Sequence, residues 1–469
     1  MQNNVRKNTY FVSIGQITKM AFAFLLFPFA TRYLGSDGMA NYALASTIMY
    51  FIFLFNDLGM NTFLTREVSK DLAQANEFYS NALTTKLILI FVDCLLLFIF
   101  LVVLQFSMEA NICIIIFAVY GILTSVFELN AGIFRAHERM EFETLFVVLE
   151  KVVTTLVGIY VLVNGWGLYA FCSVFVVGGV ISLIVSTVLA GKNFVKLKFS
   201  FNFKFIKKLV YESLPFGTSL FLANIYYSMG IILITKMEPA MVAGWYSTPA
   251  KLLKFINIIP TILAIAIFPA LSRERAYSKY KFKQLYTKGF KYISFLAIPL
   301  IFGTALLADK IALTVFGKEY GESIIVLQIL AVPAGLIFFN ILLAALFNAA
   351  NKQKILVVFQ VGALILNTII NLILIPKYAH IGTAIAALVT EGVIFIVCFI
   401  YSMVNIAKLK ELWFIPKAMA ATIIMSIFLI YFPNLNLFAA VPVAAGLYFL
   451  ILYALRGFRL EDIMFLKNN

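Results

Sequence analysis

The sequence predicts an all-α, polytopic membrane protein, and three observations support that prediction. Fourteen apolar segments, each about long enough to cross a bilayer, follow one another between Tyr10 and Arg456. Hydrophobic residues make up 62% of the 469 positions, as fourteen spans of roughly 20 residues each would require. The stretches between the segments are short, so the chain has no room for a soluble domain that could hold an active site.

Each predicted span is an apolar run that ends at a cluster of charged or helix-breaking residues. The first run contains Lys19 and is not followed by a small-residue cleavage site, so we expect it to be retained and not removed as a signal peptide. In chain order the predicted spans are 10–33, 39–64, 83–106, 110–134, 144–163, 168–190, 210–235, 241–271, 288–308, 322–347, 355–375, 381–406, 415–432 and 438–456.

The distribution of basic residues predicts the orientation of these spans. The two tails, the loops that join an even-numbered span to the next odd-numbered one, and the span ends beside them contain 27 of the 37 Lys and Arg residues. The other loops and the span ends beside them contain only Arg32, Lys236, Lys310, Lys318 and Lys377. Basic loops are retained on the cytoplasmic face, so we expect a cell-membrane protein with both termini in the cytoplasm. The same loops account for the net charge of +15 through contact with membrane lipids, and no nucleic-acid partner is expected.

The chain also matches itself at two offsets. A shift of 204 residues aligns the first two spans with the seventh and eighth, and a shift of 213 to 215 aligns spans four to six with spans ten to twelve. We therefore predict two pseudo-symmetric six-helix lobes, residues 1–200 and 201–410, with a cavity between them. Residues 411–469 have no counterpart and are expected to add two C-terminal helices and a cytoplasmic tail.

Short motifs lie near the ends of several predicted spans. They are Arg32-Tyr33-Leu34-Gly35-Ser36-Asp37-Gly38, Asn56-Asp57-Leu58-Gly59-Met60, Leu64-Thr65-Arg66-Glu67, Glu212-Ser213-Leu214-Pro215-Phe216, Phe316-Gly317-Lys318-Glu319-Tyr320 and Leu346-Phe347-Asn348-Ala349-Ala350-Asn351-Lys352. Together they resemble the polysaccharide-biosynthesis flippases, the Wzx-like branch of the multidrug/oligosaccharidyl-lipid/polysaccharide exporter superfamily, over about residues 8–405.

This resemblance implies a MATE-like fold of two six-helix lobes that works by alternating access. It also implies a function: the movement of polyprenyl-diphosphate-linked oligosaccharide from the cytoplasmic to the outer leaflet. The expected partners are the lipid-linked oligosaccharide, membrane lipids and other polysaccharide-assembly proteins. No cofactor is expected.

Ionisable residues inside the predicted N-terminal spans are candidates for the transport path, because a charge in hydrocarbon costs at least about 2.5 to 3.5 kcal/mol. Counting 1.5 Å per residue places them in one layer roughly 10 to 15 Å deep. They either pair with one another, Lys19 with Asp57 for example, or line a wet vestibule, since four carboxylates exceed two lysines. Asp57 in Asp57-Leu58-Gly59 also has the alternative role of ending its helix. The six residues are Lys19, Asp57, Asp93, Glu128, Glu150 and Lys151.

In the C-terminal lobe Lys251 and Lys254 lie near the midplane of their span, and the i, i+3 spacing places them on one face. Two like charges on one face repel unless an anion neutralises them. Glu391 in a neighbouring span is the expected partner of one lysine, which leaves the other for a diphosphate. Lys251, Lys254 and Lys19 are therefore the predicted substrate-binding residues, and Asp57, Asp93, Glu128 and Glu391 the predicted coupling layer. The alternative is that Lys254 snorkels or pairs with Glu391 while Lys251 faces water.

Three classes of function remain open at this point. The first is a lipid-linked oligosaccharide flippase, the second an ion-coupled multidrug or small-solute exporter of the same fold, and the third an integral glycosyltransferase or polymerase. The sequence contains no G-x-x-x-x-G-K-[ST] motif, so no nucleotide site of the Walker type is expected. We expect a transporter without enzymatic activity and without a metal site.

Overall fold

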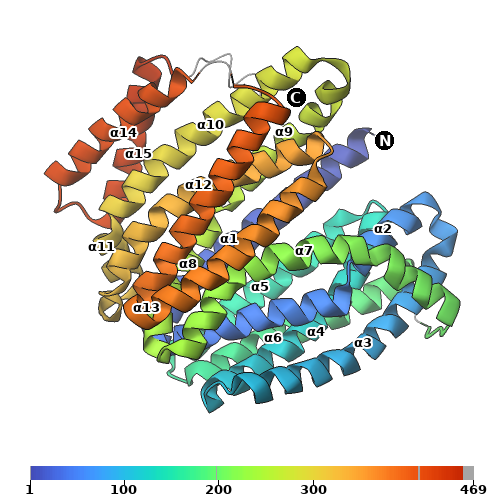
Figure 1. Cartoon of the computed structure of the whole chain (residues 1–469). Coiled ribbons are helices and arrows are strands. Elements are labelled where there is room, and N and C mark those ends of the chain that lie inside the picture. Colours follow the sequence, from blue (N-terminus) through green and yellow to red (C-terminus); the bar gives the residue numbers. More distant parts are fainter. Residues whose placement is uncertain (1, 197, 410–411, 458–469) are drawn as a thin grey trace. The chain divides into compact units, whose positions relative to one another are not determined.

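The computed structural model describes residues 2–196, 198–409 and 412–457, and within these ranges it is all helical (Figure 1). The chain divides into two compact units, Met1–Gly244 and Trp245–Asn469. The predicted assignment of span 210–235 to a C-terminal lobe stays a prediction, and each unit is described separately below.

The first unit contains the six predicted N-terminal spans and the seventh. Within it α1 packs against α4 and α5, and α4 and α5 both pack against α6, while α7 contacts α1, α2 and α3. The helices are α1 (Gln2–Asp57), α2 (Met60–Lys70), α3 (Ala75–Leu104), α4 (Met108–Ala136), α5 (Met140–Val163), α6 (Gly167–Asn193) and α7 (Phe203–Met237).

The second unit contains the remaining spans. Here α12 is central, with α9, α10 and α13 packed on it, while α14 packs on α10 and α15 on α14. The helices are α8 (Ala240–Ile256, which begins in the first unit), α9 (Ile258–Tyr277), α10 (Lys279–Leu306), α11 (Ala308–Ile311), α12 (Ser323–Ala349), α13 (Gln353–Asn405), α14 (Phe414–Tyr431) and α15 (Leu437–Ala454).

Eleven helices in the described residues are long and apolar enough to cross a membrane. Two of them are each a pair of predicted spans joined across a break: α1 is interrupted at Gly35 (φ 65°) and α13 at Ala379 (φ 48°). With α7, which covers the predicted span 210–235, these helices account for all fourteen predicted spans. The prediction of a polytopic helical membrane protein is confirmed.

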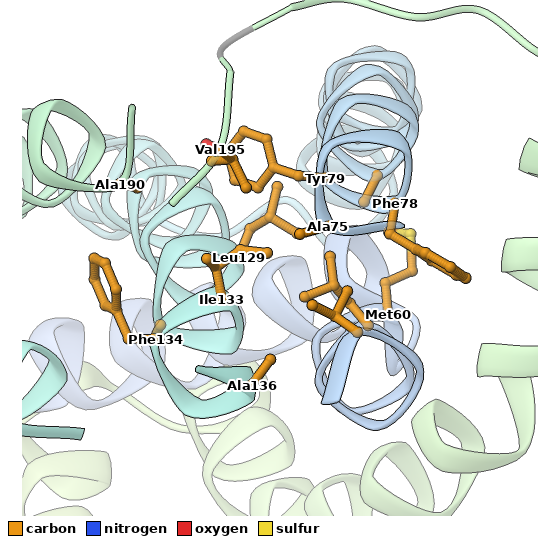
Figure 2. Packing of buried hydrophobic residues seen from close by; sticks show 14 of the residues in the cluster. Met60, Ala75, Phe78, Tyr79, Leu129, Ile133, Phe134, Ala136, Ala190 and Val195 are labelled. Atoms are coloured by element: carbon orange, nitrogen blue, oxygen red, sulfur yellow. The ribbon is translucent and has the colours of Figure 1, made fainter. Parts of the chain in front are cut away.

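Figure 2 shows the packing of a hydrophobic cluster in the first unit. Met60 comes from α2, Phe78 and Tyr79 from α3, and Phe134 from α4, and all four are buried. The Tyr79 hydroxyl donates to Asn130 Oδ1 (2.8 Å), and Asn130 in turn donates to Ser186 and Thr187 on α6. The cluster and these hydrogen bonds hold the ends of α2, α3, α4 and α6 together.

Candidate functional site

Five of the six ionisable residues predicted inside the N-terminal spans, all except Lys19, belong to three separate clusters in the structure. The first is where α1 ends, because Leu58 and Gly59 both adopt left-handed backbone conformations (φ 45° and 80°). The Asp57-Leu58-Gly59 segment therefore does break the helix, which confirms one of its two expected roles. The break places Asn56 and Asp57 beside α3 and α4.

The Asp57 cluster consists of Asn56, Asp57, Lys86, Asp93 and Ser125. Lys86 Nζ lies 3.0 Å from Asp57 Oδ1 and donates to Ser125 Oγ at 2.6 Å, and the lysine side chain is fully buried. Ser125 donates to Asn56 Oδ1 (2.7 Å), and Asn56 donates to Asp93 Oδ2 (2.8 Å). One continuous hydrogen-bonded network thus joins α1, α3 and α4, and Asp57 pairs with Lys86, not with Lys19.

The Glu150 cluster consists of Tyr120, Glu150 and Lys151. Lys151 Nζ lies 2.7 Å from Glu150 Oε1, and the Tyr120 hydroxyl donates to the same oxygen at 2.5 Å. Glu150 is buried, so both hydrogen bonds compensate for the loss of water around its charge. This cluster joins α4 to α5.

The Arg135 cluster consists of Glu128, Arg135 and Glu143. Arg135 Nη2 lies 2.9 Å from Glu128 Oε2, and the same guanidinium makes two hydrogen bonds to Glu143, of 2.8 Å from Nε and 2.6 Å from Nη2. The single positive charge of Arg135 therefore offsets one of the two negative charges, which come from Glu128 on α4 and Glu143 at the start of α5.

The sequence predicted more carboxylates than lysines inside these spans. The ion pairs with Lys86 and Arg135 correct that prediction. Lys86 lies three residues inside the predicted span 83–106, and Arg135 lies just beyond the span 110–134, so both reach carboxylates that the sequence left unmatched. Asp93 is different, because within the described residues it has a hydrogen bond from Asn56 but no ion pair. The signals that could have revealed this network are the polar residues Asn56 and Ser125 inside apolar runs.

A cavity of about 260 Å³ lies beside Asp93, between α1, α3 and α7 of the first unit. Asp93 is the single ionisable residue among the described residues that line it. The other lining residues are apolar: Ile48, Phe51, Ile52, Phe55, Leu96, Leu97, Phe100, Ile225, Met229 and Ile232.

Two of the three predicted substrate-binding lysines have solvent-accessible side chains. Lys19 on α1 and Lys254 on α8 are exposed, and within the described residues neither makes a hydrogen bond or an ion pair. Lys19 lies in the electrostatic field of Lys151, Glu128 and Glu150. Lys251 is partly buried.

In the second unit, a break between two helices lies close to Lys254. The break between α8 and α9 is at Asn257, three residues after Lys254 and three before Pro260, and Asn257 N–H donates to the Lys254 carbonyl (3.3 Å). Glu391 on α13 is buried and accepts a hydrogen bond from Asn340 Nδ2 on α12 (2.7 Å). A neutral amide therefore stabilises this carboxylate by a hydrogen bond, and the expected pairing of Glu391 with a lysine stays a prediction.

The chain is a polytopic helical membrane protein with ion-paired side chains inside its spans, a feature that marks ion and substrate pathways in many membrane proteins. Residues 5–275, more than half of the chain, match the family model described as "Polysaccharide biosynthesis protein". The chain belongs to that family.

Individual relatives agree with this assignment. The chain is 24% identical over 395 residues to a protein of Shigella dysenteriae named as an O-antigen transporter, covering 83% of this chain and 98% of that one. It is also 24% identical over 389 residues to a protein of Haloferax volcanii named as a low-salt glycan biosynthesis flippase, covering 81% and 79%. Among solved structures the fold is similar to the lipid II flippase MurJ in an inward closed conformation, with a TM-score of 0.76 at 14% identity over 95% of this chain and 97% of that one.

Proposed function

We propose that this protein is a flippase that moves polyprenyl-diphosphate-linked oligosaccharide across the cytoplasmic membrane by alternating access, with both termini in the cytoplasm. Family membership supports a lipid-linked oligosaccharide as the substrate, and one structural observation supports the binding of its diphosphate. Lys19 and Lys254 are accessible cations within spans that have no partner among the described residues. A cation kept unpaired in a span is costly, which favours a role toward an anionic ligand.

A diphosphate is suited to these lysines. Its oxygens accept charge-assisted hydrogen bonds from ammonium groups, which are roughly twice as strong as neutral ones. Lys251 shares a helix face with Lys254 and adds to the positive potential there. Lys19 in the first unit, and Lys251 with Lys254 in the second, would each attract the diphosphate headgroup of the carrier while the sugars remain in water.

The proposal is tested by replacing each of the three lysines with alanine and measuring translocation of lipid-linked oligosaccharide in reconstituted vesicles. Loss of one charged hydrogen bond of about 1.5–3 kcal/mol predicts a loss of roughly ten- to a hundredfold in apparent affinity. Lys281→Ala is the matched control, because Lys281 is exposed on α10 outside the predicted spans. Normal transport by Lys19→Ala, Lys251→Ala and Lys254→Ala would contradict the proposed diphosphate site.

A second candidate function is supported by the cavity beside Asp93. A single carboxylate among phenylalanine and aliphatic side chains matches the chemistry of a lipophilic organic cation. An exporter of such cations would bind tetraphenylphosphonium, and Asp93→Asn would weaken that binding. Binding of tetraphenylphosphonium to the purified protein, with and without this substitution, separates the two functions.

A further inference from the structure

Two lysines from different helices lie against one tryptophan in the second unit. Lys417 Nζ, on the first turn of α14, is 4.5 Å from the centroid of the Trp413 ring, and Lys291 Nζ, on α10, is 5.3 Å from the same centroid. Because both distances refer to one point, the two ammonium groups are no more than about 10 Å apart. Both positive charges therefore lie beside the same indole ring.

Packing between α10 and α14 holds this site in place. Phe414, which follows Trp413, is buried and contacts Phe290 and Phe295 of α10, with ring centroids 6.4 and 6.3 Å apart. Phe295 is held in turn by α15, whose Tyr448 hydroxyl donates to the Phe295 carbonyl at 2.9 Å. The positions of Trp413 and the two lysines are therefore set by buried contacts among three helices.

The site retains capacity to bind an anion. An ammonium has three N–H donors, and Lys417 uses one for the Arg456 carbonyl at 3.3 Å. Trp413, the residue before α14, makes no side-chain cap hydrogen bond, so backbone N–H groups of the first turn add to the positive potential. Trp413 is 44% exposed and can be reached from outside the protein.

The surroundings indicate where the anion comes from. Tryptophan and lysine are typical of the membrane interface, and the nearby start of α10 contains the basic residues Lys279, Lys281, Lys283 and Lys288. Beyond the site, α14 exposes Ile423, Ile427 and Ile430, an apolar surface that acyl chains can cover.

We propose that Lys291, Trp413 and Lys417 form a binding site for the phosphate headgroup of an anionic phospholipid of the cytoplasmic leaflet. The lipid would fix the two C-terminal helices, which have no counterpart in the predicted repeats, against α10. The inference rests on the proposed orientation of the chain but not on the proposed oligosaccharide substrate.

The test uses the fluorescence of the full chain reconstituted into vesicles of phosphatidylcholine with phosphatidylglycerol, either lipid being brominated close to its headgroup. Bromine quenches a tryptophan that it touches. The chain has three tryptophans, and a Trp413→Phe variant supplies the background from the other two. We expect brominated phosphatidylglycerol to quench the Trp413 signal several-fold more than its mole fraction predicts.

The double variant Lys291→Gln/Lys417→Gln should bring the two lipids to equal quenching. The matched control Lys279→Gln/Lys281→Gln removes the same charge from exposed positions of α10 and should keep the preference. Equal quenching in the unmodified protein, or an equal loss of preference in the control variant, would overturn the proposal. If the double variant does not fold, retention of phosphatidylglycerol through purification of the unmodified protein, compared with Trp413→Leu, decides instead: equal retention would overturn the proposal.

Discussion

The role of a charged residue inside a span depends on the side chains that surround it, as Lys86 shows. Its ammonium is fully buried and has two described partners, Asp57 and Ser125. Removing two charges from water costs several kcal/mol each, and the pair is stable only because the attraction and the hydrogen bonds offset that cost. The Asp57–Lys86 pair therefore stabilises the contact between α1 and α3 only when both side chains are present.

Lys86→Met should destabilise the protein by about 3–5 kcal/mol, because it leaves the Asp57 carboxylate buried without a cation. The double variant Asp57→Asn/Lys86→Met removes both charges and should recover most of that loss. Thermal unfolding in detergent measures both variants. Recovery in the double variant is the specific result, since a simple packing defect would add to the first loss.

An exposed ion pair on α2 provides a comparison with the buried Asp57–Lys86 pair. Arg66 and Glu67 on α2 also form an ion pair, at 2.7 Å, but the arginine side chain is 46% exposed. Exposed pairs contribute about 0–1 kcal/mol, so Arg66→Gln should change unfolding little. Similar losses for Arg66→Gln and Lys86→Met would mean that burial of the Lys86 pair does not determine its effect.

At the scale of whole helices, the positions of the breaks follow from backbone geometry. Gly35 ends the first half of α1 with a positive φ, which glycine adopts at little cost. Immediately after it the chain approaches the start of α8 so closely that a Cβ on Gly244 would lie 2.0 Å from the Ser36 carbonyl oxygen. The contact requires a residue without a side chain at position 244.

Gly244→Ala should therefore destabilise the first unit by roughly 1–3 kcal/mol, because the backbone of the Gly35–Ser36 corner must move to admit the methyl group. Gly392→Ala is the matched control: Gly392 lies within α13, and a Cβ there would meet nothing within 4 Å. That change should be neutral or stabilising by about 0.5–1 kcal/mol. Chemical unfolding of the two variants measures the difference, and equal effects would contradict the close contact.

For the whole molecule, the spans were predictable and the pairing of charges was not. Apolar length alone locates a helix, because a bilayer demands about 20 apolar residues whatever their neighbours are. The partner of Asp57 depends on which helices pack together, and Lys86 is 29 positions away in the sequence. Arg135 lies just beyond the end of its predicted span, but its long side chain reaches Glu128, which the residue count placed deeper in the membrane.

The proposed alternating access involves the whole molecule, and we propose Asp93 as the carboxylate that couples it to an ion gradient. Alternating access needs a ligand or ion that binds one state better than the other. Asp57, Glu128 and Glu150 each form an ion pair with a cation, which stabilises the ionised carboxylate. Asp93 has only the Asn56 amide, which can donate to a carboxylate or to a neutral carboxyl group.

Asp93→Asn preserves an oxygen that can accept the hydrogen bond from Asn56, so the fold should remain intact. We expect the variant to translocate lipid-linked oligosaccharide in vesicles at a rate independent of an imposed pH gradient, whereas the unmodified protein responds to it. Glu128→Gln is the control and should keep the response, because Glu128 is neutralised by Arg135. An unchanged response to the gradient in Asp93→Asn would show that Asp93 is part of the scaffold, and Glu391 would then be the remaining carboxylate to test.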